Sequence, residues 1–292
     1  TEENKSLAQF PAYVDSLVSL NVRRGQKLVA IGGGIIQDIT CFLAATMMRG
    51  LPWMFYPTTL LAQSDSCIGS KSSINSGEVK NILGTFTPPE QVVINVDFLQ
   101  TLEEKDISSG IGEMIKVHAI DSPASFNLMA QSYEKIHNDR LEMEKLIYRS
   151  LLIKKRLIEA DEFDLGPRNV MNYGHSFGHA IESATNFAIP HGIAVTIGMD
   201  IANYVAAKLG VSTDNHFERM HDVMDKNCHT YRHVDIDVNL LMLALSKDKK
   251  NSATQLRLIL PDQDGCIRIG LYDNNDALLD NIKDYFAIYG GQ

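Results

Sequence analysis

Short apolar runs alternate with helical patterns in the first third of the chain. Residues 28–31 form an apolar run that ends in three glycines, as a buried parallel strand does, and residues 36–48 then have a helical pattern of small and apolar side chains. Two further apolar runs, residues 53–56 and 92–94, have the length of strands. Strands that alternate with helices predict a mostly parallel sheet.

Helical patterns dominate the rest of the chain. They cover residues 109–120, 124–137, 141–159, 171–185 and 191–209, and then come two strand-like runs at 256–260 and 266–269, which indicate a short hairpin, and a last helix near 275–286. The pattern changes near residues 101–108. We therefore predict an α/β domain over residues 1–103 and an all-α domain over residues 104–292.

Composition narrows the possible partners. A length of 292 residues favours two domains, and a formal net charge of −9 argues against nucleic acid as the main partner. The four cysteines are far apart and form no CxxC pair, which favours reduced thiols in the cytoplasm. No apolar run approaches the ~20 residues that span a bilayer, so we expect no membrane partner.

The glycine triplet is the first feature that indicates chemistry. Gly33 and Gly34 stand between a predicted strand and a predicted helix, where the backbone can approach a pyrophosphate at the helix N-terminus. The triplet is not GxGxxG, so a plain strand-to-helix turn remains an alternative. Asp38, one turn further on, is either a solvated surface acid or a residue that faces a nicotinamide.

A histidine cluster is more informative. His175 and His179 are four residues apart and share one helical face, and His191 follows at a Pro-His-Gly helix start. With Glu113 from an earlier helix, one carboxylate and two imidazoles give the usual open shell of a catalytic zinc ion. A structural or surface histidine pair is the alternative.

Several cations and their polar neighbours form a third group. They lie in the Ser-rich segment between two predicted strands and in the helical half: Asp65, Lys71, Lys80, Asn81, Lys116, Lys154 and Lys249. Solvated lysines are the ordinary case, but such a set can also bind a phosphate and a carboxylate. Lys116 follows Glu113 by three residues and shares its helical face.

These residues resemble those of 3-dehydroquinate synthase and the wider sugar-phosphate cyclase family. The matching segments run in order along nearly the whole chain: GGGIIQD (32–38), RG (49–50), PTTLLAQSDS (57–66), SKSSIN (70–75), VKN (79–81), SGIGEMIK (109–116), DEFDLGPRNVMNYGHSFGHAIE (161–182), HGIAV (191–195) and DKKN (248–251) with LRLILP (256–261). The first strands of the family's Rossmann-like NAD-binding domain are absent here, because the chain starts at the family's E-x-x-K motif.

The resemblance implies a role for each matching residue. It implies a divalent metal on Glu113, His175 and His191, with zinc expected first and cobalt or iron also suitable. The implied catalytic residues are His179, Lys116, Asp65 and Asn172. The implied substrate contacts are Arg49, Lys71, Lys80, Asn81, Lys154, Arg168 and Lys249, with Lys250 as an alternative to Lys249. The implied NAD contacts are Glu2, Lys5, Gly33, Gly34, Asp38, Thr58 and Thr59. Arg49 would reach the substrate of a neighbouring subunit, which implies a homodimer.

The implied activity is that of a phosphate-eliminating lyase of the shikimate pathway. It converts 3-deoxy-D-arabino-heptulosonate 7-phosphate into 3-dehydroquinate and phosphate by transient oxidation with NAD, elimination, re-reduction and aldol closure. Ser70 and Ile193 depart from the family's usual residues, so a sister cyclase acting on another heptulose or hexose phosphate stays open. A metal-dependent polyol dehydrogenase is the second alternative, and a non-catalytic binding protein is the third.

Overall fold

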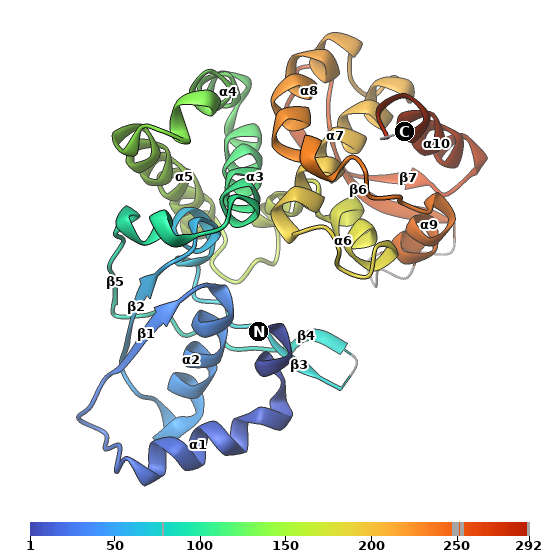
Figure 1. Ribbon diagram of the computed structural model, residues 1–292. Coiled ribbons are helices and arrows are strands. Elements are labelled where there is room, and N and C mark those ends of the chain that lie inside the picture. Colours follow the sequence, from blue (N-terminus) through green and yellow to red (C-terminus); the bar gives the residue numbers. More distant parts are fainter. Residues whose placement is uncertain (78, 247–250, 252–253, 291–292) are drawn as a thin grey trace.

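The computed structural model describes residues 1–290 except 78, 247–250 and 252–253. Figure 1 shows two lobes, an N-terminal one around β1, β2 and α2 and a larger helical one from α3 to α10. The predicted fold class, α/β followed by a helical part, is confirmed. The predicted division into residues 1–103 and 104–292 stays a prediction; α3 begins at Glu104.

The N-terminal lobe is built on a small parallel sheet. β1 (Leu28–Gly32), β2 (Trp53–Pro57) and β5 (Gln91–Val92) pair in the order β1-β2-β5. Trp53 and Phe55 of β2 are buried, and α2 (Gly34–Thr46) packs on β1 and β2. The predicted strands and the helix between them are thereby confirmed.

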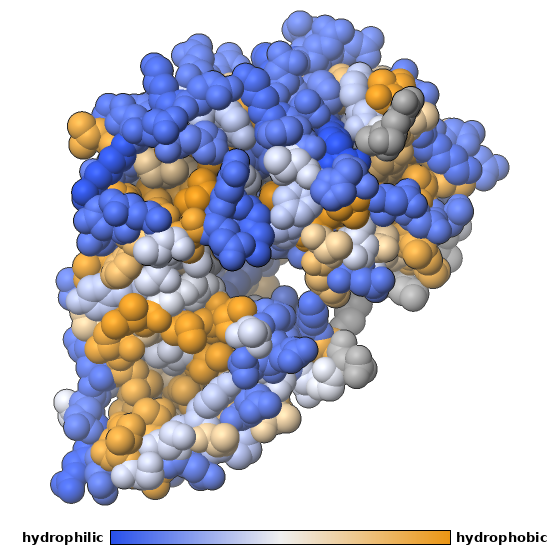
Figure 2. Space-filling view, viewed as in Figure 1, coloured by the Kyte–Doolittle hydropathy of each residue, from blue (hydrophilic) through white to orange (hydrophobic). Residues whose placement is uncertain are grey.

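Other elements of this lobe were not predicted. They are α1 (Phe10–Ser19) and the antiparallel hairpin of β3 (Ile74–Ser76) and β4 (Val79–Leu83). The β4 side chains are exposed wherever they are described, so no alternation of apolar and polar positions marks this strand in the sequence. Val29 and Ile31 of β1 are exposed as well, and Figure 2 shows apolar surface gathered over the N-terminal lobe.

The helical lobe surrounds α7, which is buried over nearly its whole length. Its helices are α3 (Glu104–Asp121), α4 (Pro123–Ile136), α5 (Arg140–Ala160), α6 (His175–Ala184), α7 (His191–Lys208), α8 (Asp214–Cys228), α9 (Val238–Ser246) and α10 (Asp276–Tyr289). β6 (Gln255–Pro261) and β7 (Ile267–Asp273) form the predicted hairpin. α8 and α9 were not predicted.

Glycines allow α3 and α7 to approach closely. A Cβ atom on Gly112 would lie 2.2 Å from the carbonyl oxygen of Gly192, and one on Gly192 would lie 1.8 Å from that of Ser109. Ser109 Oγ also accepts a hydrogen bond from the Gly192 backbone N–H at 2.9 Å. This contact fixes the start of α7 against α3, and therefore His191 near Glu113.

The predicted helix over residues 171–185 is wrong in its first part. A 3₁₀ segment, η6 (Pro167–Asn172), comes first, and α6 starts only at His175. Gly174 between them has φ +77°, and a Cβ atom there would lie 2.5 Å from Met199 Cγ. A left-handed glycine pressed against α7 interrupts the helix, so His175, like His191, is the first residue of its helix.

None of the described helices combines the length and apolar character needed to cross a membrane.

Candidate metal and substrate site

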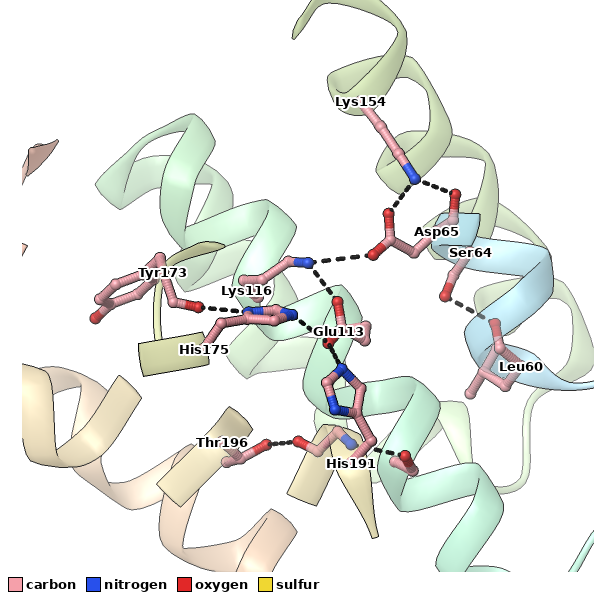
Figure 3. Close-up of polar contacts among 12 residues, drawn as sticks. Leu60, Ser64, Asp65, Glu113, Lys116, Lys154, Tyr173, His175, His191 and Thr196 are labelled. Atoms are coloured by element: carbon pink, nitrogen blue, oxygen red, sulfur yellow. Dashed lines mark hydrogen bonds and ion pairs between the residues drawn. The ribbon is translucent and has the colours of Figure 1, made fainter. Parts of the chain in front are cut away.

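Glu113 lies at the centre of the site, on α3, and is 2% exposed. Its Oε1 atom is 3.7 Å from Nε2 of His175 and 3.6 Å from Nε2 of His191 (Figure 3). Among the described residues, this buried oxygen has no hydrogen-bond partner. Three donor atoms from α3, α6 and α7 thus converge on one point, and the described residues leave the oxygen among them unsatisfied.

Each imidazole is oriented through its other ring nitrogen. His175 Nδ1 is 3.3 Å from the Tyr173 carbonyl oxygen, and His191 Nδ1 is 3.2 Å from Glu182 Oε1. Because a carbonyl or a carboxylate accepts, each Nδ1 carries the hydrogen, and each Nε2 presents a lone pair towards Glu113. This is how proteins hold histidine ligands to a metal.

The electrostatics fit a divalent cation at this point. Burial raises the pKa of Glu113, although Lys116 opposes the shift. Burial also holds the pKa of His175 well below its usual value. Burial acts to lower the pKa of His191, but the bond to Glu182 and the charges of Glu113 and Glu182 outweigh it, so this pKa is raised. A metal ion would supply the positive charge that keeps Glu113 ionised.

His179 lies one turn further along α6, beside both imidazoles. The ring nitrogens of His175, His179 and His191 include donor atoms within 4.8 Å of one another. His179 is the exposed member of this trio. It is therefore placed either as a further ligand or as a proton-transfer group at the edge of the site.

A buried ionic network adjoins Glu113. Asp65 Oδ2 is 3.1 Å from Lys116 Nζ, and Asp65 Oδ1 is 2.6 Å from Lys154 Nζ, while Lys116 also pairs with Glu113 (Figure 3). A short π-helical segment, η4 (Ala62–Ser66), presents Asp65 to α3 and α5. Burial opposes ionisation of Asp65, but the charges of Lys116 and Lys154 hold its pKa well below the usual range.

The predicted residues Arg168 and Asn172 lie in η6, just before α6, and contact neighbouring parts of the chain. Arg168 is 5% exposed, and its Nη1 donates to the Glu162 carbonyl oxygen at 2.6 Å. Its Nη2 lies over Gly69, where a Cβ atom would come within 2.5 Å. Asn172 lines a small cavity of about 50 Å³ with His175 and His179.

The remaining predicted substrate residues lie apart from this cluster. Lys71 Nζ is 2.5 Å from Asp164 Oδ2, and Lys80 Nζ is 3.4 Å from the centroid of the Phe187 ring. Arg49 is exposed and has φ +66°, within a run of three positive φ values over residues 48–50. Lys249 and Lys250 lie outside the described residues.

The predicted nucleotide contacts gather at the ends of β1 and β2. Lys5 Nζ is 3.0 Å from Asp38 Oδ2, 3.0 Å from Asn81 Oδ1 and 3.4 Å from Glu2 Oε1. The structure thus groups Asn81 with the predicted NAD contacts rather than with the metal cluster. A Cβ atom on Gly33 would lie 2.9 Å from Thr59 Cγ2, so the two strand-to-helix turns touch. Thr58 and Gly34 belong to these same turns.

Two polar residues of the site had no role assigned from the sequence. Glu182 orients His191, and Arg257 of β6 lines the small cavity with Asn172, His175 and His179. The spacing offered a signal for Glu182, because it follows His179 by three residues and so shares its helical face. Arg257 comes from a distant hairpin, and only the fold brings it there.

Comparison with known proteins identifies the family of the chain. The family model described as 3-dehydroquinate synthase N-terminal matches residues 1–109, and the one described as 3-dehydroquinate synthase C-terminal matches residues 110–251. The chain is 34% identical over 283 residues to the 3-dehydroquinate synthase of Streptococcus pyogenes serotype M5 (strain Manfredo), covering 96% of the chain and 79% of the relative. It is 38% identical over 275 residues to that of Dictyoglomus thermophilum, covering 92% and 76%.

Solved structures share the fold. A 2-epi-5-epi-valiolone synthase from Streptomyces hygroscopicus with NAD⁺ and Zn²⁺ bound superposes with TM-score 0.84 at 25% identity, covering 99% of this chain and 80% of that one. A 2-deoxy-scyllo-inosose synthase complexed with carbaglucose-6-phosphate, NAD⁺ and Co²⁺ has TM-score 0.84 at 23% identity, covering 97% and 81%, and is similar in fold. Both family models and these curated relatives lead to one conclusion: the chain belongs to the 3-dehydroquinate synthase family.

Proposed function

We propose that the chain acts as a 3-dehydroquinate synthase, converting 3-deoxy-D-arabino-heptulosonate 7-phosphate into 3-dehydroquinate and phosphate with NAD and a divalent metal. One observation carries the proposal: Glu113 Oε1, buried and without a hydrogen bond among the described residues, faces two correctly oriented imidazoles. Relatives named 3-dehydroquinate synthase, and a cyclase structure with NAD⁺ and Zn²⁺, support it.

Glu113, His175 and His191 would hold the metal, and the turns after β1 and β2 would hold NAD. When bound, NAD would supply reversible hydride transfer, from a ring carbinol carbon and back to the resulting ketone, and the metal would polarise the oxygen on that carbon. Zinc is the first expectation, since three nitrogen and oxygen ligands with open positions are typical of catalytic zinc.

The chain's own residues supply proton transfer and anion binding. Asp65 stays ionised between Lys116 and Lys154, so it can accept a hydrogen bond from a substrate hydroxyl. His179 at the edge of the trio can take or deliver a proton. Asn172, beside it, can orient a hydroxyl.

The substrate's two anionic groups need cations. Arg168 and Lys249 would bind the carboxylate, and Arg49 of a second copy would reach the phosphate, so the functional form would be a homodimer. The positive φ values at residues 48–50 support a functional role for this turn, because such backbone strain concentrates at binding sites. Lys71 and Lys80 lie on the surface between the lobes. On substrate binding they would leave their present partners, Asp164 and Phe187, and contact the phosphate.

A sister cyclase is the second candidate. It would act on a heptulose or hexose phosphate without a carboxylate, and the present contact of Arg168 with the Glu162 carbonyl oxygen favours it. The shared fold with cyclases of that kind fits as well. A cytoplasmic location fits either candidate, and the four cysteines are free.

The test is phosphate release with NAD⁺ and Zn²⁺ from the heptulosonate phosphate and from matched sugar phosphates without the carboxylate. We expect kcat/KM to favour the acid substrate, and Arg168→Ala to lower it at least about a hundredfold while Zn²⁺ and NAD⁺ still bind. Preference of the wild type for the non-acid sugars would establish the sister cyclase. Net release of NADH would indicate a polyol dehydrogenase and overturn both.

A further inference from the structure

A cavity of about 620 Å³ lies between α3, α4 and α5, in the wall of the helical lobe. Its volume is within the ~300–1,000 Å³ typical of small-molecule sites. Its lining residues come from the end of α3, the start of α4 and the second half of α5. None of them is a predicted metal, nucleotide or substrate residue, so the cavity is separate from the metal and substrate site.

The cavity lies on the side of α3 and α5 that faces away from the metal cluster. On α5, Arg149, Leu152, Ile153 and Arg156 recur at spacings of three and four, so they share one face, while Lys154 binds Asp65. On α3, His118 follows Lys116 by two residues, about 200° around the helix. Each helix therefore presents one face to the active site and another to the cavity.

A buried imidazole in the lining has one ring nitrogen without a hydrogen bond to any described residue. His118 is 1% exposed, its Nδ1 is 2.9 Å from Ser125 Oγ, and its Nε2 has no hydrogen bond in the part of the chain that the structure describes. Burial lowers the pKa of His118 to about 4, and the charge of Arg149 acts in the same direction, so the ring is neutral at pH 7. In the tautomer that the inference requires, the Ser125 hydroxyl donates to Nδ1, and Nε2–H is then a buried donor that an added acceptor would satisfy.

The charges around the cavity do not cancel. The lining includes three cations, Arg149, Lys155 and Arg156, but only two carboxylates, Asp121 and Glu159. Arg156 pairs with Asp121 at 2.6 Å, and Lys155 pairs with Glu159 at 3.6 Å. Within the described ranges Arg149 has no ion pair, so one positive charge is left near the ring of His118, whose Nε2 has no hydrogen bond there.

The rest of the lining is apolar. Leu128 comes from α4, and Leu152 and Ile153 come from α5. An inorganic anion would leave these side chains without contacts, and a neutral apolar molecule would leave Arg149 and His118 without an acceptor. The combination therefore selects a ligand that has one negative group and an apolar body.

We propose that this cavity binds a small organic monoanion, with its carboxylate at Arg149 and His118 and its apolar part against Leu152 and Ile153. This site is separate from the catalytic one, and the proposal does not depend on which sugar phosphate the enzyme converts.

The test uses benzoate and its neutral analogue benzamide with the full chain, by calorimetry or ligand-observed NMR. We expect benzoate to bind with a Kd of about a millimolar or tighter, and benzamide at least about tenfold more weakly. Arg149→Gln should weaken benzoate binding about tenfold or more. Lys145→Gln is the matched control, because it removes the same charge from the same helix at an exposed position outside the cavity.

A second variant tests whether benzoate binds in this cavity, rather than whether the charge of Arg149 is needed. Leu152→Trp should fill the cavity and abolish benzoate binding, and Leu152 is 43% exposed, so the larger ring can be accommodated with an unchanged thermal unfolding profile. Equal effects of Arg149→Gln and Lys145→Gln, equal binding of benzoate and benzamide, or no binding at all would each overturn the proposal. Retained binding in Leu152→Trp with loss in Arg168→Ala would move benzoate to the substrate site and overturn it too.

Discussion

The helical lobe contains two buried ionic clusters that differ in how completely their atoms are paired. In the metal-side cluster (Glu113, Asp65, Lys116, His175 and His191), Glu113 Oε1 has no hydrogen bond among the described residues. In the Asp200 cluster (Asp200, His221, Arg232 and Tyr285), Asp200 is fully buried and both of its oxygens are in use. Both clusters join several helices, so position in the fold does not distinguish them.

The pairing of Asp200 is complete. Its Oδ2 accepts from the Tyr285 hydroxyl at 2.7 Å and lies 2.9 Å from His221 Nδ1 and 3.7 Å from Arg232 Nη2, and its Oδ1 is 3.1 Å from His221 Nδ1. α7, α8 and α10 are tied together in this way. A satisfied buried network specifies packing, whereas an unsatisfied one is held ready for a ligand. The comparison predicts that the two clusters respond to mutation in opposite ways.

The largest expected effect is on stability, at Asp200. Asp200→Ala leaves the buried Tyr285 hydroxyl and His221 Nδ1 without their acceptor and removes a carboxylate from beside Arg232, which keeps Asp225. We expect the free energy of unfolding to fall by about 3–5 kcal/mol. Urea unfolding of the metal-free protein measures this. Asp280→Ala, at an exposed position of α10, is the control and should change stability by no more than ~0.5 kcal/mol. Equal losses in the two variants would contradict the structural role of Asp200.

The next prediction concerns Glu113 and separates metal binding from stability. Glu113→Gln keeps the shape of the side chain, and Lys116 keeps Asp65 as a partner. We therefore expect the metal-free variant to unfold within about 1 kcal/mol of the wild type. Its Zn²⁺ affinity should fall by at least about a hundredfold, or about 2.7 kcal/mol, because a charged ligand is lost. Zinc titration and urea unfolding on the same samples measure both. A large loss of stability without a change in zinc affinity would mean that Glu113, like Asp200, stabilises the fold and does not bind the metal.

The two clusters also differ in how far the sequence predicts them. Glu113, His175 and His191 could be grouped because one carboxylate and two imidazoles are typical of a catalytic zinc site, and because the family resemblance covers segments that lie far apart in the chain. Asp200 and Tyr285 are ordinary residues 85 positions apart, and only the packing of α10 on α7 brings them together.

Local backbone geometry set a second limit on prediction. The helical pattern continues through residues 171–174, so nothing in it shows that Gly174 adopts φ +77° against α7. The β3–β4 hairpin was not predicted for a related reason, because the exposed side chains of β4 carry no periodic signal and β3 has only three residues. Tertiary contacts, rather than local preference, decide both features.

A smaller effect on metal binding is expected at Glu182. This carboxylate holds His191 through Nδ1 at 3.2 Å but is not itself one of the converging donors. Glu182→Gln should lower Zn²⁺ affinity by about 10–100-fold, as is usual for a group that orients a ligand. Glu159→Gln, at the exposed end of α5, is the matched control. Unchanged zinc affinity in Glu182→Gln would mean that His191 is held by helix packing alone.

The smallest expected effect concerns pH, and it isolates one pair of the Asp200 cluster. Burial acts to lower the pKa of His221, but the hydrogen bond to Asp200 and its charge outweigh burial, so the pKa is raised. A raised pKa in the folded state means that the contribution to stability is fully present below the unfolded value, about 6.5, and is lost as pH rises through the folded value. The stability difference between wild type and His221→Gln should therefore be larger at pH 5.5 than at pH 8.5. Repeating the pair in an Asp200→Asn background completes a double-mutant cycle, in which the pH dependence of the difference should disappear. If the pH dependence persists in the Asp200→Asn background, the raised pKa of His221 comes from other charges around it, such as Asp225, and not from its pairing with Asp200.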